Sequence, residues 1–308
     1  MKEIYHLNRL IKDETFRFAN LLLKDIDNKP VLAINNPDVA EQQTSLFHKD
    51  ISCGDDYFET LHDLVHEALS SGNAAPIVRF ADGEYAFYAY DLNCNGLYQQ
   101  AESVEAIKKA LPQHIDALRV LSHTGKLAPL IFPGNVQSPK KGLLSFLRMG
   151  KSDNSAQAFV EFLYDNKIFI TGENYIPFYI VYAYLTSRQF SEVVDGKKLC
   201  IIGSECNVDL CRKWFRRFSS NPEFTFIQVP ESYVATQWKF IRKGILDKMP
   251  SDVDLCLVGA GIGSLLVCVD VANRFSIPAI DAGHVLNMMN SREDKSNGPR
   301  LYTLRKGE

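Results

Sequence analysis

The stretch DLCLVGAGIGSLLVCVDVANRFSIPAIDAG, residues 254–283, decides the fold. An apolar run over 255–258 leads into three glycines, a helix-length segment that reaches Phe275, and a second strand-like run over Ile277–Asp281. A strand, a helix and a strand in this order form a βαβ unit, whose two strands are parallel. The stretch therefore predicts a parallel sheet.

Short apolar runs alternate with helix-length segments over most of the chain. Further strands are predicted at 76–80, 167–171, 198–203 and 224–229. Helices are predicted at 56–70, 103–122, 153–165, 176–185 and 208–218, and a loop over a site at 125–142. Apolar runs without alternation are typical of strands covered on both faces. The sequence thus predicts an α/β, Rossmann-like fold, a mostly parallel sheet with helices on both faces.

The first 55 residues have a different pattern. Apolar residues recur at roughly helical spacing between Ile4 and Leu22, and a polar, irregular stretch follows over 30–55. We expect a helical arm and linker over 1–55 and the main domain over 56–308. The amphipathic arm is compatible with packing on the main domain, with forming an oligomer or with covering the site.

Composition and charge exclude several classes of protein. Lys+Arg 34 against Asp+Glu 37 gives a net charge of -3, which argues against a nucleic-acid partner. The start of the chain carries mixed charges instead of an apolar signal core, and the longest uncharged stretch, 255–269, is too short to span a bilayer. Seven cysteines without a Cys-x-x-Cys pair indicate reduced packing residues. We expect a soluble, cytoplasmic protein without a membrane span.

Small and polar residues follow the predicted strands at their carboxyl ends, where open parallel sheets bind ligands. Glycine allows close approach of a ligand to the backbone, and carboxylates can hold a cation. The pattern indicates a site for a phosphate-bearing ligand and is compatible with a divalent cation. The segments are Ala81-Asp82-Gly83-Glu84, Thr171-Gly172-Glu173-Asn174, Gly203-Ser204-Glu205, Gly259-Ala260-Gly261 and Asp281-Ala282-Gly283-His284.

The segment Asp82-Gly83-Glu84 stands out because it follows a strand that contains Arg79. Two carboxylates around a tight turn can point the same way and bind Mg²⁺ or Mn²⁺ through oxygen. The alternative is a turn-forming Asp-Gly followed by a solvated Glu84. Arg79, buried in an apolar strand, needs a partner, either a ligand phosphate or an internal salt bridge with Asp82 or Glu84.

The glycines at 259, 261 and 263 lie between a strand and a helix, a place that suits a phosphate at the helix N-terminus. Asp281 loosely completes a dinucleotide-binding fingerprint, and the alternative is a glycine turn that only packs. His284 is either a phosphate or acid/base contact or a solvent-facing cap. Four other histidines are predicted at the surface: His62, His66, His114 and His123.

Two segments resemble a known family. Residues 78–85, VRFADGEY, are similar to the Arg-x-Gly-Asp-Gly-Glu segment of the GT-D-type glycosyltransferases, bacterial enzymes formerly grouped as a domain of unknown function. Residues 257–261 together with 280–284 resemble the later glycine turn and Asp-x-Gly-His of that family. The resemblance covers about 56–292. The chain departs from the family at Ala81, where a glycine is usual, and it lacks a proline and lysine after Gly261.

The resemblance implies a metal-dependent glycosyltransferase that uses a nucleotide-sugar donor, a UDP-sugar in the leading interpretation, and a glycan or glycoprotein acceptor. It implies that Asp82 and Glu84 hold Mn²⁺ or Mg²⁺, that Asp281 or His284 contacts the donor, and that an acid deprotonates the acceptor hydroxyl. The expected donor-binding residues are Arg79, Gly83, Gly172, Glu173, Asn174, Gly203, Ser204, Glu205, Gly259 and Gly261. The alternatives are an NAD(P)-linked oxidoreductase built on the Gly259 turn and Asp281, and a non-catalytic scaffold with a nucleotide-sugar fold.

Overall fold

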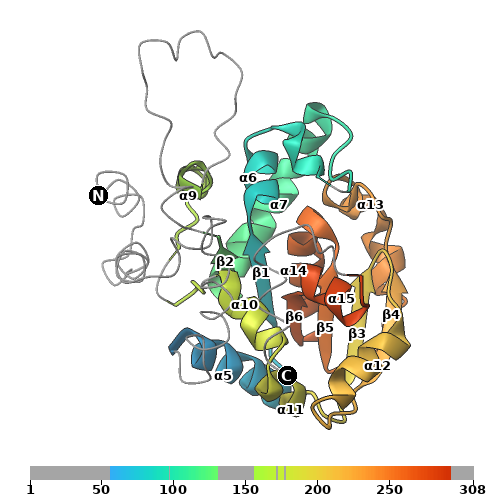
Figure 1. Ribbon diagram of the computed structural model, residues 1–308. Coiled ribbons are helices and arrows are strands. Elements are labelled where there is room, and N and C mark those ends of the chain that lie inside the picture. Colours follow the sequence, from blue (N-terminus) through green and yellow to red (C-terminus); the bar gives the residue numbers. More distant parts are fainter. Residues whose placement is uncertain (1–55, 97, 131–155, 171–172, 177, 293–308) are drawn as a thin grey trace, which may run out of the picture.

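The computed structural model describes residues 56–96, 98–130, 156–170, 173–176 and 178–292 (Figure 1). Its centre is a six-stranded sheet in the order β2-β1-β6-β5-β3-β4, and every pair of neighbouring strands is parallel. The strands are β1 (Ala75–Phe80), β2 (Lys126–Pro129), β3 (Lys198–Gly203), β4 (Glu223–Gln228), β5 (Leu255–Gly259) and β6 (Pro278–Asp281). The predicted arm and linker over 1–55 lie outside the described residues.

Helices cover both faces of the sheet, as the uninterrupted apolar strands predict. One face carries α6 (Asp82–Tyr88), α7 (Val104–Thr124), α9 (Ala156–Asp165), α13 (Val234–Leu246) and α14 (Ser264–Phe275). The other carries α5 (Asp56–Ser71), α10 (Phe178–Leu185), α11 (Arg188–Val193), α12 (Val208–Arg216) and α15 (Gly283–Met289). Short 3₁₀ turns lie at η2 (Leu92–Asn95) and η4 (Gly261–Gly263). Within the described residues, no helix has the length and apolar character needed to cross a bilayer.

Side chains of each strand alternate between the two faces. In β5, Leu255 and Leu257 pack toward α12 and α15, whereas Cys256 and Val258 pack toward α13 and α14. All four residues are fully buried. Burial on both faces explains why such a strand appears in the sequence as a continuous apolar run.

One predicted strand is wrong and another strand was not predicted. Residues 168–170 form no strand, although Ile168 and Ile170 are buried, and Lys167 before them has a left-handed backbone with φ of 60°. The strand at that edge of the sheet is β2, inside the region predicted as a loop. Only Leu127 and Ala128 mark it as apolar, and Gly125 and Pro129 at its ends are typical of a loop.

The order of the strands brings several carboxyl ends together. The chain leaves β1 toward one edge of the sheet, where β2 lies, and leaves β3 toward the opposite edge, where β4 lies. Strands β6 and β5 fill the space between them. The point at which connections diverge is where open α/β sheets bind ligands. The loops that follow β1, β6 and β5 therefore border the candidate site.

His114 is fully buried, so its predicted surface position is wrong. Its Nε2 is 2.8 Å from the Ala235 carbonyl oxygen, and its Nδ1 is 3.1 Å from the Tyr88 hydroxyl. A neutral ring that donates from Nε2 and accepts at Nδ1 satisfies both contacts. Burial lowers the pKa of His114 to about 4 from its ordinary value of 6.5.

This buried imidazole predicts a loss of stability in acid. Above pH 6.5 the group is neutral in both folded and unfolded chains and contributes nothing. As the pH falls toward 4, the unfolded chain binds a proton that the folded chain excludes, at a cost of about 3 kcal/mol. Between pH 7 and 4, the free energy of unfolding measured with urea should fall less for His114→Gln than for the parent, and the difference should be that amount. His123→Gln, which changes an exposed histidine, should keep the parent slope, and equal slopes for all three proteins contradict the prediction.

Candidate functional site at the carboxyl edge of the sheet

Asp82, Gly83 and Glu84 form the first turn of α6, where a tight turn was predicted. Ala81 is the N-cap, and its backbone N–H donates to Glu84 Oε2 at 2.8 Å. This contact is the Glu half of a capping box, which satisfies one of the free amides at a helix start. Residues two apart on a helix face different sides. The helical spacing of Asp82 and Glu84 therefore does not bring their carboxylates to one side, as the predicted turn would.

Both carboxylates nevertheless lie at the N-terminal end of α6. Glu84 folds back over this end to reach Ala81, and the residue is partly exposed. Burial, with a further contribution from the negative charge of Asp281, raises the pKa of Glu84 to about 7, against the lowering effect of the Ala81 hydrogen bond. Asp82 is exposed. The end of the helix thus presents one solvent-facing and one desolvated acid.

A buried ion pair joins β1 to β6. Arg79 Nη2 is 3.1 Å from Asp281 Oδ1, and Arg79 Nε donates to the Asp281 carbonyl oxygen at 3.1 Å. Both side chains are at most 10% exposed. Burial by itself would lower the pKa of Arg79, but the charge of Asp281 outweighs it and the pKa rises above its ordinary value. The salt bridge predicted for Arg79 exists, with Asp281 as its partner in place of Asp82 or Glu84.

The Arg79 guanidinium is enclosed on its remaining sides. It lies 4.4 Å from the ring centroid of Tyr182 and 5.4 Å from that of Phe178, both on α10. At Gly283 a Cβ atom would come within 2.4 Å of Arg79 Nη2, and φ there is +23°. Only glycine leaves room for the guanidinium at the start of α15. This ion pair therefore holds the ends of two adjacent strands and the first turn of a helix together.

The glycine turn after β5 is filled by a side chain that the sequence analysis missed, Gln100. Gln100 Oε1 accepts from the Ile262 amide at 3.0 Å, and a Cβ on Gly261, where φ is +56°, would lie 2.4 Å from the same oxygen. The amides of Ala260 and Gly263 also donate within the protein, to Ser264 Oγ and the Ala260 carbonyl. These contacts favour the packing interpretation of the turn. A partner 162 residues away leaves no local sequence signal.

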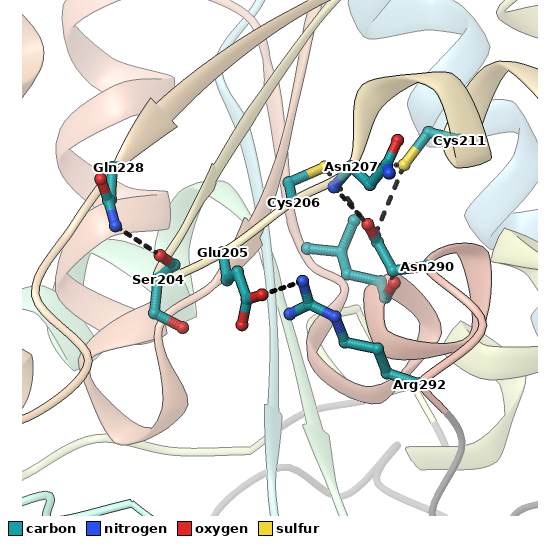
Figure 2. Close-up of polar contacts among 9 residues, drawn as sticks. Ser204, Glu205, Cys206, Asn207, Cys211, Gln228, Asn290 and Arg292 are labelled. Atoms are coloured by element: carbon teal, nitrogen blue, oxygen red, sulfur yellow. Dashed lines mark hydrogen bonds and ion pairs between the residues drawn. The ribbon is translucent and has the colours of Figure 1, made fainter.

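The residues after β3 are tied to the end of the described chain. Figure 2 shows Glu205 paired with Arg292, while the Ser204 carbonyl accepts from Gln228 Nε2 at 3.0 Å. Gly203 lies opposite Gly259 in the sheet, so a Cβ there would be 3.3 Å from the Gly259 carbonyl oxygen. These residues lie at the carboxyl edge as predicted, on the far side of β5 from Asp82.

Glu173 and Asn174 lie away from this edge, contrary to the prediction. Lys126 Nζ donates to the Glu173 carbonyl, and buried Asn174 donates to the carbonyls of Ser122 and Phe169. Lys126 is level with Ile77 in the sheet, three residues before the end of β1, or about 10 Å. The prediction placed Glu173 and Asn174 after a strand at 167–171, and residues 168–170 form no strand. Gly172 lies outside the described residues.

The donor atoms at the carboxyl edge suit a hard cation. Asp82 and Glu84 offer carboxylate oxygen, the ligand that Mg²⁺ and Mn²⁺ prefer. Among the described residues no group of three or more His, Cys, Asp or Glu side chains is arranged to hold a metal ion. Proteins usually bind Mg²⁺ through one or two carboxylates, and substrate phosphates and water supply the other ligands. His284 lies one strand away, partly buried in the first turn of α15.

The Arg79–Asp281 pair predicts a specific stability pattern. Asp281→Ala should lower the free energy of unfolding by about 3–5 kcal/mol, because it leaves a buried guanidinium without its partner. The double variant Arg79→Met/Asp281→Leu should recover most of that loss, since no buried charge remains. Urea titration of the single and double variants measures both. If Asp281→Ala unfolds with the parent midpoint, the pair does not join the strands as described.

Comparisons with known proteins give a family match and two similar solved structures. The family model of the GT-D fold-like domain matches residues 145–289, which include β3 to β6. Two similar solved structures are of the domain of unknown function 1792, each covering 76% of this chain and 84% of its own with a TM-score of 0.45. One is a selenomethionine-substituted form, 18% identical; the other, 17% identical, is described as having a distinct glycosyltransferase fold. A search among curated proteins found no significant match. Over residues 145–289, then, the chain is similar to the GT-D fold-like domain.

Proposed function

We propose that the protein is a metal-dependent glycosyltransferase that moves a sugar from a nucleotide-sugar donor, a UDP-sugar, to a glycan or glycoprotein acceptor. The observation that carries the proposal is the position of Asp82 and Glu84. They follow β1 and stand next to the end of β6, in a sheet whose strands β3 to β6 lie in the region that matches the GT-D fold-like domain. That position is where a parallel sheet of this order binds its ligand.

Asp82 and Glu84 would hold Mn²⁺ or Mg²⁺ through carboxylate oxygen. Bound there, the cation would act as a Lewis acid that stabilises the negative charge of the departing nucleoside diphosphate. Glu84 lies in the first turn of α6 with Asp82, and a cation bound there would offset the burial and the charge of Asp281 that raise its pKa.

Gly83 gives the diphosphate access to the backbone at the start of α6. A Cβ at Gly83 would meet no atom of the described residues within 4 Å, so their packing does not require glycine at this position. An alanine is favoured over glycine in a helix by roughly 0.5–1 kcal/mol. The glycine is then explained by the ligand: without a side chain, phosphate oxygens can contact the first amides of the helix.

The other residues of the edge have separate roles in this proposal. Asp281 is a positioning residue, because its carboxylate is committed to Arg79 beneath the surface. His284, in the first turn of α15, is the group assigned to contact the donor or the acceptor hydroxyl. Glu205, paired with Arg292, borders the site on the β3 side.

The proposal predicts metal-assisted binding of UDP that depends on Asp82. By calorimetry or thermal shift, UDP should bind at least about tenfold more tightly with Mn²⁺ than with a chelator, and Asp82→Ala should remove this gain. Asp209→Ala is the matched control, since Asp209 is also exposed in the first turn of a helix and lies on α12. NAD⁺ and NADP⁺ should give no shift. Equal UDP affinity with metal and with chelator rules out the metal.

Gly83→Ala separates ligand binding from folding. We expect a free energy of unfolding equal to that of the parent or roughly 0.5–1 kcal/mol higher, together with weaker UDP binding in the presence of Mn²⁺. Gly244→Ala is the control, because Gly244 is also helical, lies on α13 and, within the described parts of the chain, has no atom within 4 Å of a built Cβ. Unchanged UDP affinity in Gly83→Ala would show that no diphosphate approaches this backbone.

A further inference from the structure

Two thiols lie in contact where β3 passes into α12. Cys206 Sγ is 3.6 Å from Cys211 Sγ, and only four residues separate the two in the chain (Figure 2). Cys206 precedes Asn207, the N-cap of α12, and Cys211 lies in the helix. A disulfide bond is about 2.05 Å long, so a modest approach of the sulfurs is enough to form one.

A side chain from another element binds both sulfurs. Asn290, at the end of α15, has its Nδ2 3.8 Å from Cys206 Sγ and 3.6 Å from Cys211 Sγ. Its Oδ1 accepts from the Asn207 amide, which fixes the position of the Asn290 side chain relative to α12. The amide of Asn290 can therefore donate to either sulfur and stabilise a thiolate.

The two thiols differ in their surroundings. Cys206 is partly exposed, and hydrogen bonding from Cys211, together with Asn290 and the charge of Arg292, lowers its pKa. Cys211 is fully buried, and its contact with Cys206 and its burial raise its pKa. The other described cysteines, Cys94, Cys200, Cys256 and Cys268, are all buried. An accessible thiolate beside a buried thiol is the arrangement of an attacking and a resolving cysteine.

We propose that Cys206 and Cys211 form a reversible oxidation site that takes a peroxide as its oxidant. The Cys206 thiolate attacks one peroxide oxygen, the O–O bond breaks, and a sulfenic acid and hydroxide (or water, once protonated) result. The Cys211 sulfur then attacks the Cys206 sulfur, the S–O bond breaks, and the products are a disulfide and water. Overall two thiols and one hydrogen peroxide give one disulfide and two waters, and a thiol reductant reverses the bond formation.

The disulfide would close a short loop around the N-cap of α12. Asn207 Oδ1 accepts from the amides of Asp209 and Leu210 within that loop. Fixing both ends of the loop limits opening of the first turn, so the oxidised protein should exchange the amide hydrogens of residues 207–211 more slowly than the reduced protein. This readout does not depend on any enzymatic activity.

The test uses the full chain, reduced, freed of reductant and treated with hydrogen peroxide. Peptide mass spectrometry should find a loss of two hydrogens between Cys206 and Cys211, and dithiothreitol should restore them. Cys211→Ser should stop at a sulfenic acid on Cys206 that dimedone traps, whereas Cys206→Ser should give neither disulfide nor adduct at Cys211. Cys94→Ser, which changes another buried cysteine, should oxidise like the parent.

Arg292→Gln tests whether the positive charge of Arg292 lowers the pKa of Cys206. Removing the guanidinium should slow alkylation of Cys206 by iodoacetamide roughly two- to fivefold at neutral pH and shift its pH–rate profile upward, while folding is unchanged. The proposal is overturned if Cys206 is alkylated no faster than the buried cysteines, if peroxide leaves both thiols free, or if Cys206 goes to the sulfinic acid without pairing with Cys211.

Discussion

The ion pair between Arg79 and Asp281 is the interaction on which the candidate site depends. The pair is buried and joins two strands through residues that are 202 positions apart in the chain. It also requires a glycine at position 283. A buried pair of this kind contributes little net free energy, but losing one member is costly. Its effect is therefore one of position: it sets the end of β1, and with it Asp82 and Glu84, beside the end of β6 and the start of α15.

The residues at the carboxyl edge differ in whether contacts inside the protein occupy their side chains. Arg79, Asp281 and Gln100 are occupied by contacts inside the protein. Asp82 is exposed, and no atom of the described residues lies within 4 Å of a Cβ built at Gly83. Close packing thus accounts for Gly261 and Gly283, and the proposed function assigns the start of α6 to ligand binding.

The sequence predicts the parts of the fold that local patterns determine. The buried strands around 198–203 and 255–258 form where the sequence has continuous apolar runs. A strand that is buried on both faces needs apolar residues at successive positions, so the run identifies it. Strand β2 was missed because two apolar residues between Gly125 and Pro129 are too few to mark it. The false strand at 167–171 arose because Ile168 and Ile170 are buried by packing alone. Of the site, the strand ends were predicted, but Asp281 as the partner of Arg79 was not, since pairing across 202 residues depends on tertiary structure.

The most direct measurement is an anomalous difference map at the manganese edge, from crystals of the protein grown with MnCl₂ and UDP. The account predicts one peak within coordination distance of the Asp82 and Glu84 carboxylates, with the diphosphate of UDP next to Gly83. A manganese peak away from α6, or UDP bound elsewhere on the protein with these two carboxylates free of metal, would contradict it.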